Sequence, residues 1–306
     1  MEEFYQSCHI CPRNCKVNRF DGKKGICNVP SDLFVSRASL HMWEEPCISG
    51  TKGSGTVFFS GCNLHCIFCQ NSEISGVDPL GKKITVEHLS AIFLDLQRKG
   101  ANNINLVTPS HYIPSIAKAL IMSKENGLTI PVVYNSSGYD SVERLKMLEG
   151  LVDIWLPDFK YVNSEPALSF SNASDYPEIA KKALQEMVRQ SPVPIFDEKT
   201  GLLKKGVIVR HLVLPGHTKE SLQVLDYLYN TYKDSIYISI MNQYTPFFDL
   251  LDKNKAPKEL YRKVTKREYE KVVDYAINLG IKNGFTQEGK AASESFVPDF
   301  GSYEGI

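Results

Sequence analysis

The chain has 306 residues, with 35 lysines and arginines against 35 aspartates and glutamates, so its formal net charge is +0 at pH 7. This length suffices for one large domain with an appendage. Balanced charge gives no long-range field that would favour nucleic acid or an anionic membrane as a partner. No apolar run approaches the roughly 18 residues that span a bilayer, and the first residues, Met-Glu-Glu-Phe, lack the pattern of a signal peptide. The sequence therefore predicts a cytoplasmic protein.

Four of the eight cysteines lie near the N-terminus, at Cys8, Cys11, Cys15 and Cys27. In a reducing compartment such cysteines are expected to be metal ligands rather than disulfides. Four thiolates can close a structural zinc site, can hold an iron–sulfur cluster that relays electrons, or can remain free thiols. We expect residues 1–50 to form a loop-rich, cysteine-rich extension that needs a metal to hold its shape. Cys47 stands alone and is expected in a loop or in the core.

From residue 51 onward, short apolar runs rich in β-forming residues alternate with helical patterns. The predicted strands cover residues 56–60, 103–107, 130–134, 152–156, 207–214 and 235–240. Such alternation predicts a parallel sheet and an α/β fold. Six units predict a partial (βα)6 barrel of the TIM type over residues 51–288, followed by a loose tail or lid over residues 289–306.

Three sequences have the form of a capping box, which opens a helix. They are Asp140–Glu143, Asp175–Glu178 and Thr265–Glu268. After the last of these, apolar side chains recur with the spacing of one helix face.

Directly after the first predicted strand, Cys62, Cys66 and Cys69 form a C-x3-C-x2-C run. Three thiolates this close can bind three irons of a [4Fe–4S] cube and leave the fourth iron open. Three ligands and a water can also hold zinc, and cysteines in a turn can be inert. The position of the run on a loop that follows a strand favours the cluster.

In (βα) barrels the active site lies at the carboxyl ends of the strands. Polar residues follow or end each of the other predicted strands: Thr108, Asn135 and Ser136, Asp158 and Lys160, Arg210 and His211, and finally Gln243 and Tyr244. We expect catalytic side chains among Asp158, Lys160, Arg210 and His211. Because Arg210 and His211 are adjacent on a strand, only one of the two can face the interior.

The run from Ile48 to Asn71 resembles the radical SAM superfamily, which cleaves S-adenosylmethionine (SAM). Within it, the run resembles the uncharacterised pyruvate-formate-lyase-activating-enzyme-like proteins of the PflX type. Asp175–Glu178, Val209–Gly216 and the N-terminal cysteine spacing are similar to the same group, whereas the last 60 residues resemble it less.

The resemblance implies that the open iron of the cluster chelates SAM. One electron, from a donor of the flavodoxin or ferredoxin type, would split SAM to a 5′-deoxyadenosyl radical that abstracts hydrogen. Phe68 would then lie against the adenine, and Asn71 would belong to the same SAM site. Thr108 stands where many relatives carry a glutamate that accepts from the SAM amino group.

By the same resemblance, Asp158 and Lys160 form a D-x-K motif similar to that of glycyl-radical-enzyme activases. Asp158, with Asn135 and Ser136, would lie by the methionyl end of SAM, in some relatives with a monovalent cation. Lys160 would neutralise a carboxylate or contact substrate.

Three functions remain open from the sequence. The first is an oxidoreductase that activates a glycyl-radical enzyme. The second is a radical SAM enzyme that acts on a small molecule or on another protein side chain. The third is an iron–sulfur protein that transfers electrons without catalysis.

Overall fold

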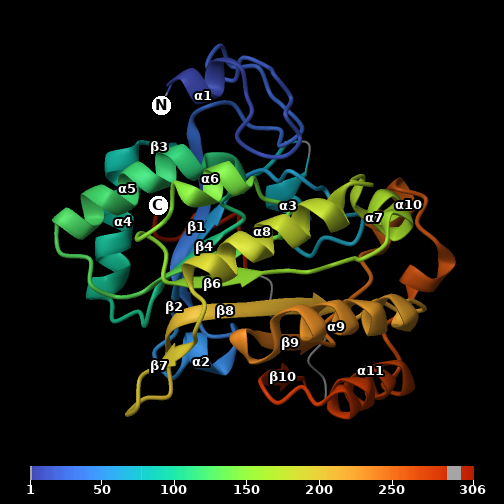
Figure 1. The fold of residues 1–306 in the computed structure, drawn as a ribbon. Coiled ribbons are helices and arrows are strands. Elements are labelled where there is room, and N and C mark those ends of the chain that lie inside the picture. Colours follow the sequence, from blue (N-terminus) through green and yellow to red (C-terminus); the bar gives the residue numbers. More distant parts are fainter. Residues whose placement is uncertain (1, 77, 288–297) are drawn as a thin grey trace.

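The computed structural model describes residues 2–76, 78–287 and 298–306. Its centre is one sheet with the strand order β10-β9-β8-β6-β5-β4-β2-β1-β3, with β7 paired to β8 (Figure 1). The strands are β1 (Leu33–His41), β2 (Ser54–Phe59), β3 (Lys82–Ile84), β4 (Ile104–Val107), β5 (Val132–Ser136), β6 (Ile154–Pro157), β7 (Ile195–Phe196), β8 (Leu203–Leu212), β9 (Tyr237–Met241) and β10 (Gly284–Thr286). All neighbours from β2 to β10 along this order are parallel.

Each of the six predicted strands overlaps one of the parallel strands, and their order in the sheet follows their order in the chain. The predicted α/β fold with a mostly parallel sheet is therefore confirmed. The curvature of a partial barrel stays a prediction, as does the division of the chain at residues 50 and 288.

The sheet extends beyond the predicted strands on the side of β2. Strand β1 pairs antiparallel with β2 over residues 35–41, and β3 pairs antiparallel with β1. The polypeptide before residue 50 thus contributes a nine-residue strand to the main sheet.

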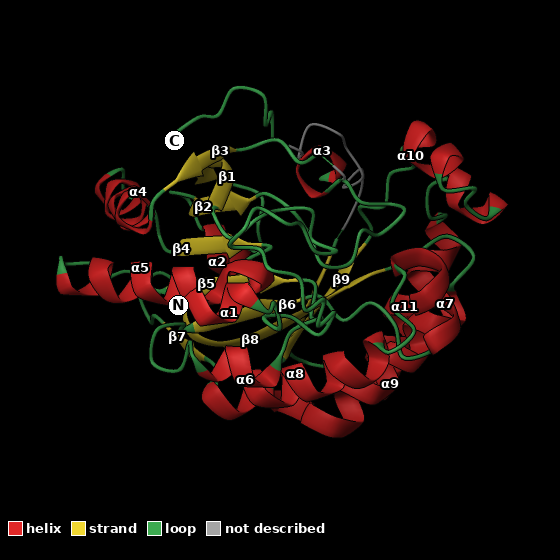
Figure 2. Ribbon diagram, turned by 90° about the horizontal axis from the view of Figure 1, so that it is seen from above, coloured by secondary structure: helices red, strands yellow, loops and turns green. Residues whose placement is uncertain are grey.

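The helices are α1 (Glu2–Gln6), α2 (Pro46–Ser49), α3 (Ser72–Ser75), α4 (Val86–Arg98), α5 (Ile113–Glu125), α6 (Val142–Lys146), α7 (Ser164–Ser171), α8 (Tyr176–Gln190), α9 (Thr218–Tyr232), α10 (Phe248–Lys253) and α11 (Lys266–Leu279). Figure 2 shows α5, α6, α8 and α9 along one side of the strands. Among the described residues no helix is both long and apolar enough to cross a bilayer.

Alternation along the strands separates two faces of the sheet. Leu106, Tyr134 and Trp155 belong to the main apolar core, together with buried residues of the long helices. On the opposite face, Ile154 packs with Cys47 and other residues around α2 in a second, smaller cluster. Long helices on one face and only short segments on the other leave room for a pocket on that second face.

The described C-terminal residues pack against this sheet. The Phe300 ring is buried and lies 5.3 Å from the Phe58 ring, and Ala38 N donates to Glu304 O at 2.9 Å. The expected loose tail is therefore wrong for residues 298–306, while residues 289–297 lie outside the described part of the chain.

The three predicted capping boxes differ in outcome. Thr265 and Glu268 form a complete capping box at α11. At α6 the N-cap is Ser141 without a side-chain bond, because the Asp140 carboxylate accepts from Tyr134 and Ser136 instead. At α8 Asp175 is the N-cap residue, but its carboxylate accepts from Tyr139. The prediction of side-chain caps at α6 and α8 is wrong.

This difference predicts unequal effects of removing the two N-cap hydroxyls. Thr265→Ala should lower the free energy of unfolding by about 1 kcal/mol, because a backbone N–H at the start of α11 loses its acceptor. Ser141→Ala removes no side-chain cap bond and should cost only a few tenths of a kcal/mol. Urea unfolding of both variants measures the difference, and equal losses would contradict the capping assignment.

Candidate functional site

The face of the sheet opposite the long helices carries a pocket of about 810 Å³, a size at the upper end of the roughly 300–1,000 Å³ of ligand pockets. We call it the central pocket. Its walls come from the carboxyl-terminal parts of β5, β6, β8 and β9, from the loop over residues 61–71 that carries three cysteines, and from residues 41–50. The parallel strands thus bring residues distant in sequence to one site, as expected for this topology.

The cysteine loop, residues 61–71, follows β2 directly. Its backbone turns at Gly61, where φ is +88° and a Cβ would lie 2.5 Å from the carbonyl oxygen of Cys27. Only glycine fits such a close approach at positive φ. Cys66 and Cys69 line the central pocket, and Cys62 is buried beside them.

Several donors surround these three sulfurs. Leu64 N donates to Cys62 Sγ at 3.4 Å, and Ser75 Oγ donates to Cys69 Sγ at 3.3 Å. Ser171 Oγ lies 3.0 Å from Cys66 Sγ. Hydrogen bonds of this kind stabilise thiolates and tune the potential of a cluster that they hold.

The thiols of the loop need a cation to become thiolates. Burial, and then the neighbouring Cys66 and Cys69, raise the pKa of Cys62 to about 12, and burial raises the pKa of Cys69 as well. Within the described chain no group of three or more His, Cys, Asp or Glu side chains is placed to hold one metal ion.

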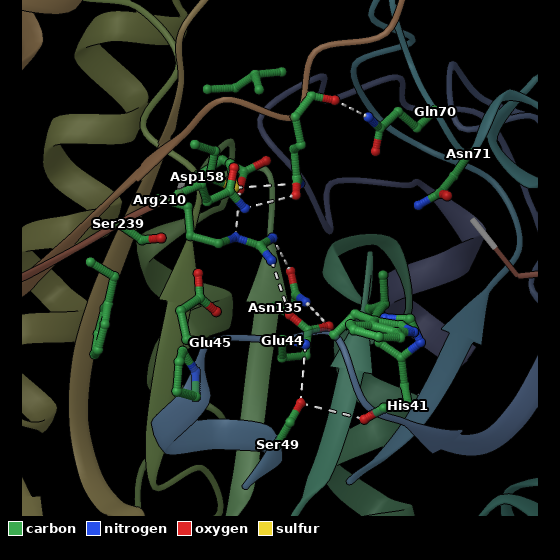
Figure 3. A pocket seen from close by; sticks show the side chains of 18 of the residues that line it. His41, Glu44, Glu45, Ser49, Gln70, Asn71, Asn135, Asp158, Arg210 and Ser239 are labelled. Carbon is green, nitrogen blue, oxygen red and sulfur yellow. Dashed lines mark hydrogen bonds and ion pairs between the residues drawn. The ribbon is translucent and has the colours of Figure 1, made fainter. Parts of the chain in front are cut away.

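Beside the cysteine loop, charged side chains form a connected network (Figure 3). Arg210 Nε donates to Asp158 Oδ1 at 3.0 Å, and its Nη1 donates to Glu44 Oε2 at 3.2 Å. The remaining amino group, Nη2, donates to Asn135 Oδ1 at 2.6 Å. Lys160 Nζ lies 2.6 Å from the second Asp158 oxygen.

These contacts fix the charge of the network. Burial favours the neutral form of Asp158, yet the cations of Lys160 and Arg210 outweigh it and lower the pKa of that carboxyl. Burial raises the pKa of Glu44, and Arg210 opposes the rise. Asp158 is therefore a carboxylate whose two oxygens are occupied by cations, and it orients the arginine and the lysine toward the pocket.

Adjacent strand positions among the predicted site residues fall on different faces. Asn135 lines the pocket, whereas Ser136 is buried and donates to Asp140. Arg210 lines the pocket, whereas His211 lies between the Phe159 carbonyl and the Ser221 hydroxyl, in contact with the helix layer. Burial lowers the pKa of His211. The structure therefore brings Arg210 to the other site residues and keeps His211 apart from them.

The remaining predicted residues are divided in the same way. Phe68 lines the pocket with its ring 6.2 Å from that of Tyr244, and Asn71 and Gln243 line it too. Within the described part of the chain, Thr108 is not among the residues that line the pocket. It has a positive φ of 58° and donates its N–H to the Asn135 carbonyl at 2.9 Å. Its contact with the SAM amino group stays a prediction.

Two site residues are absent from the sequence-based set. Glu44 and Glu45 enter the pocket from the segment after β1. In the sequence, an acidic pair followed by proline has the composition of a surface turn. Only a prediction of β1 could have identified these two residues as part of the site, because β1 leads the chain to the face of the sheet that carries the pocket.

The loop after β4 contains a buried histidine. His111 Nε2 donates to the Ser60 carbonyl at 2.8 Å, and Nδ1 has no hydrogen-bond partner within the described residues. Burial lowers the pKa of His111 to about 3. The unfolded chain therefore binds a proton near pH 6.5 that the folded chain does not, and stability falls as the pH drops below about 6.5.

This linkage predicts a measurable pH effect. Between pH 7.5 and pH 5.5, His111 should reduce the free energy of unfolding by about 1.4 kcal/mol. In His111→Gln, which keeps a donor near Ser60, this part of the pH dependence should vanish. Urea unfolding at both pH values provides the comparison. An unchanged difference between the two pH values would show that other groups cause it.

The four N-terminal cysteines, over residues 8–27, also lie near one another. We call this segment the N-terminal cysteine module. Cys8, Cys11 and Cys27 are buried, and burial followed by the charges of its three neighbouring cysteines raises the pKa of Cys11 to about 12, against a weaker opposing backbone hydrogen bond. Ile26 N donates to Cys15 Sγ at 3.4 Å.

A buried arginine completes the module. Arg19 is 0 % exposed and donates to the carbonyl oxygens of Val29, Pro30 and His111. Its Nη1 lies 3.8 Å from Cys8 Sγ. Within the described part of the chain, no carboxylate bonds to it. A buried cation without an anionic partner is costly, and thiolates of the module would supply that partner.

The module is attached to the cysteine loop. Arg13 donates to the carbonyl oxygens of Asn63, Ser171 and Asn172, and the His65 ring bonds to the Ile26 carbonyl. These contacts hold the two groups of cysteines against each other.

Comparison with known proteins agrees with this site. The family model described as "Radical SAM superfamily" matches residues 56–228. An uncharacterized protein of Methanocaldococcus jannaschii, MJ0674, is 31% identical over 284 residues, which cover 90% of this chain and 75% of the relative. A second uncharacterized protein of that organism, MJ0808, is 25% identical over 226 residues, covering 69% of this chain and 61% of the relative.

Among solved structures, SuiB of Streptococcus suis bound to the precursor peptide SuiA gives a TM-score of 0.51 at 13% identity, over 75% of this chain and 47% of that chain. SuiB bound to S-adenosylmethionine gives 0.50 at 13% identity, over 76% and 52%. This chain therefore spans about half the length of SuiB, and a likeness at this identity shows the fold alone. The family model covers more than half of the 306 residues: this chain belongs to the radical SAM superfamily.

Proposed function

We propose that this protein is a radical SAM enzyme whose substrate binds in the central pocket beside the cysteine loop. The family implies a [4Fe–4S] cluster and SAM. The observation that carries the proposal is the position of Cys62, Cys66 and Cys69, with hydroxyl and amide donors around them, at the edge of a pocket that also holds the Asp158–Arg210 network.

The bound group would supply one-electron cleavage of SAM and a radical that abstracts hydrogen. The side chains of this chain have the complementary tasks. Cys62, Cys66 and Cys69 would hold the cluster, and Phe68 would pack against the cofactor. Asp158 holds Lys160 and Arg210 in place as fixed cations, which suits them to bind the SAM carboxylate.

The direct test is anaerobic. The protein is reconstituted with iron and sulfide, reduced with dithionite and mixed with SAM, and 5′-deoxyadenosine is measured by mass spectrometry. We expect 5′-deoxyadenosine to form without any added partner. A protein with a fully loaded cluster that forms none, with either dithionite or a flavodoxin as donor, would favour the non-enzymatic alternative.

A narrower proposal concerns the substrate. The Asp158–Lys160 pair supports activation of a glycyl-radical enzyme, as in the resembling activases, with the pocket receiving a glycine loop. The buried acidic pair Glu44 and Glu45 supports instead a small molecule or another side chain, because a glycine backbone offers no charge to it. Glycyl radical formation on a co-encoded partner, measured by electron paramagnetic resonance, would decide for the activase.

We further propose that the N-terminal cysteine module holds a second iron–sulfur cluster that passes electrons to the first. The buried Arg19 beside Cys8, and the attachment of the module to the cysteine loop through Arg13, support it.

This proposal predicts metal content. The reconstituted protein should bind about eight irons per chain, and Cys11→Ser about four, since each [4Fe–4S] cluster holds four irons. Cys11→Ser should keep SAM cleavage with dithionite but lose much of it with a protein donor. Zinc at about one per chain with about four irons would assign the module to a structural zinc site instead.

A further inference from the structure

Glu45 lies at the opposite end of the central pocket from the cysteine loop. Figure 3 shows Gln70 and Asn71 at one end, Glu44, Glu45 and Ser49 at the other, and Asp158, Asn135 and Arg210 between them. Residues 46–49 form α2, which packs against the sheet behind Glu45. A ligand that reaches Glu45 therefore extends past the ion-pair network, away from the cysteines.

The two neighbouring glutamates have different surroundings. Glu44 accepts from Asn105 and from Arg210, at 2.9 and 3.2 Å. Glu45 is only 9 % exposed, yet its Oε2 has no hydrogen-bond partner among the described residues. A buried carboxylate oxygen without a donor costs free energy, and so its position calls for a ligand that supplies one.

The charged residues of the pocket also indicate that Glu45 is available to a cationic ligand. Among the described lining residues, Glu44, Glu45 and Asp158 are acidic, and Lys160 and Arg210 are basic. Asp158 pairs with Lys160, and Glu44 pairs with Arg210. Among these described residues Glu45 has no ion pair of its own. Burial raises the pKa of Glu45, and the charge of Arg210 and a hydrogen bond with Ser239, which also lines the pocket, oppose the rise.

We propose that Glu45 binds a positively charged group of the substrate, a primary ammonium or a guanidinium, at the end of the central pocket opposite the cluster. This deepens the proposed function, because it names the substrate class of the same pocket. SAM also carries an ammonium group, but the family chemistry holds it at the cluster, at the other end. The positively charged group can belong to a free amine or to a lysine or arginine side chain of a peptide.

Binding is tested on the reconstituted protein saturated with SAM and left unreduced, so that no turnover is needed. Calorimetry with n-butylammonium and n-butylguanidinium should show binding, whereas 1-butanol and butyrate should not bind. Glu45→Gln should weaken binding of the two cations at least about tenfold, since a charge-assisted hydrogen bond is lost. Glu125→Gln, an exposed residue at the end of α5, is the matched control and should bind as wild type does.

A second measurement separates binding from a structural role. Glu45→Gln should change the melting temperature of the protein little, because the carboxylate oxygen Oε2 has no hydrogen-bond partner to lose among the described residues. Glu44→Gln should lower it, because that carboxylate is paired. A large fall for Glu45→Gln would overturn the proposal, as would equal binding of 1-butanol. Weaker SAM binding by Glu45→Gln would also overturn it, by assigning the carboxylate to the cofactor.

A peptide with one lysine, compared with the same peptide carrying norleucine, identifies the source of the cation. Preference for the lysine peptide over butylammonium indicates a peptide substrate, and the reverse indicates a small amine; absence of both contradicts the proposal. Cation binding in a protein that never cleaves SAM would leave this inference standing and remove the proposed function. SAM cleavage without cation binding would do the opposite.

Discussion

Replacing Cys66 by alanine should abolish SAM cleavage. At metal sites, removal of a side chain that only supports a ligand lowers metal affinity or activity about 10–100-fold. Removal of a cluster ligand itself should lower the rate of SAM cleavage by more than that. Cys66 lines the central pocket, and its sulfur lies beside the Ser171 hydroxyl. Formation of 5′-deoxyadenosine under dithionite measures the effect.

The control is Cys47→Ala, which removes a buried thiol from α2 without touching the cysteine loop. It should keep the iron content and the cleavage activity of the wild type. Full cleavage by Cys66→Ala would refute the assignment of the cluster to this loop. Loss of iron in both variants would indicate general unfolding rather than loss of a ligand.

The second large effect is expected at Arg210. Its guanidinium holds Asp158, Glu44 and Asn135 at once, and it is only 16 % exposed. Arg210→Met removes the cation that pairs with the largely buried carboxylates of Asp158 and Glu44. It should lower the free energy of unfolding by about 3–5 kcal/mol. Urea unfolding at pH 7.5 gives the value.

A double variant tests the electrostatic origin of this loss. Adding Glu44→Gln to Arg210→Met removes one of the uncompensated carboxylates and should restore part of the stability. Additive losses would show that packing rather than charge explains the effect. Because Lys160 and Arg210 lower the pKa of Asp158, their contribution should be present above about pH 3.9 and be lost as the pH falls through the lowered pKa.

The six parallel strands could be predicted because each is a buried apolar run, and such runs carry their own signal. Strand β1 could not, since Ser36, Arg37 and Ser39 interrupt its apolar residues. Its polar side chains have partners supplied by distant segments, as Ser36 has in Ser60 and the Leu80 carbonyl. A local sequence pattern contains no information about tertiary contacts of this kind, and so β1 could not be predicted from it.

The candidate site shows the same division. Local spacing predicted Cys62, Cys66 and Cys69 as one group, and strand ends predicted Asp158 and Arg210. Which of two adjacent residues faces the pocket could not be predicted without the strand register, as His211 illustrates. Local capping patterns failed at Asp140 because a buried tyrosine and a buried serine compete for its oxygens.

The pairing of β1 with β2 has a consequence for any shortened form of the protein. The family match begins at residue 56, yet the backbone N–H and C=O groups on one side of β2 are bonded to β1. A chain that began at residue 51 would keep every ligand of the cysteine loop but turn β2, whose six residues are all buried in the full chain, into an edge strand unpaired on the side of β1. Such an edge recruits strands from other molecules, so the shortened chain would aggregate before its chemistry was tested.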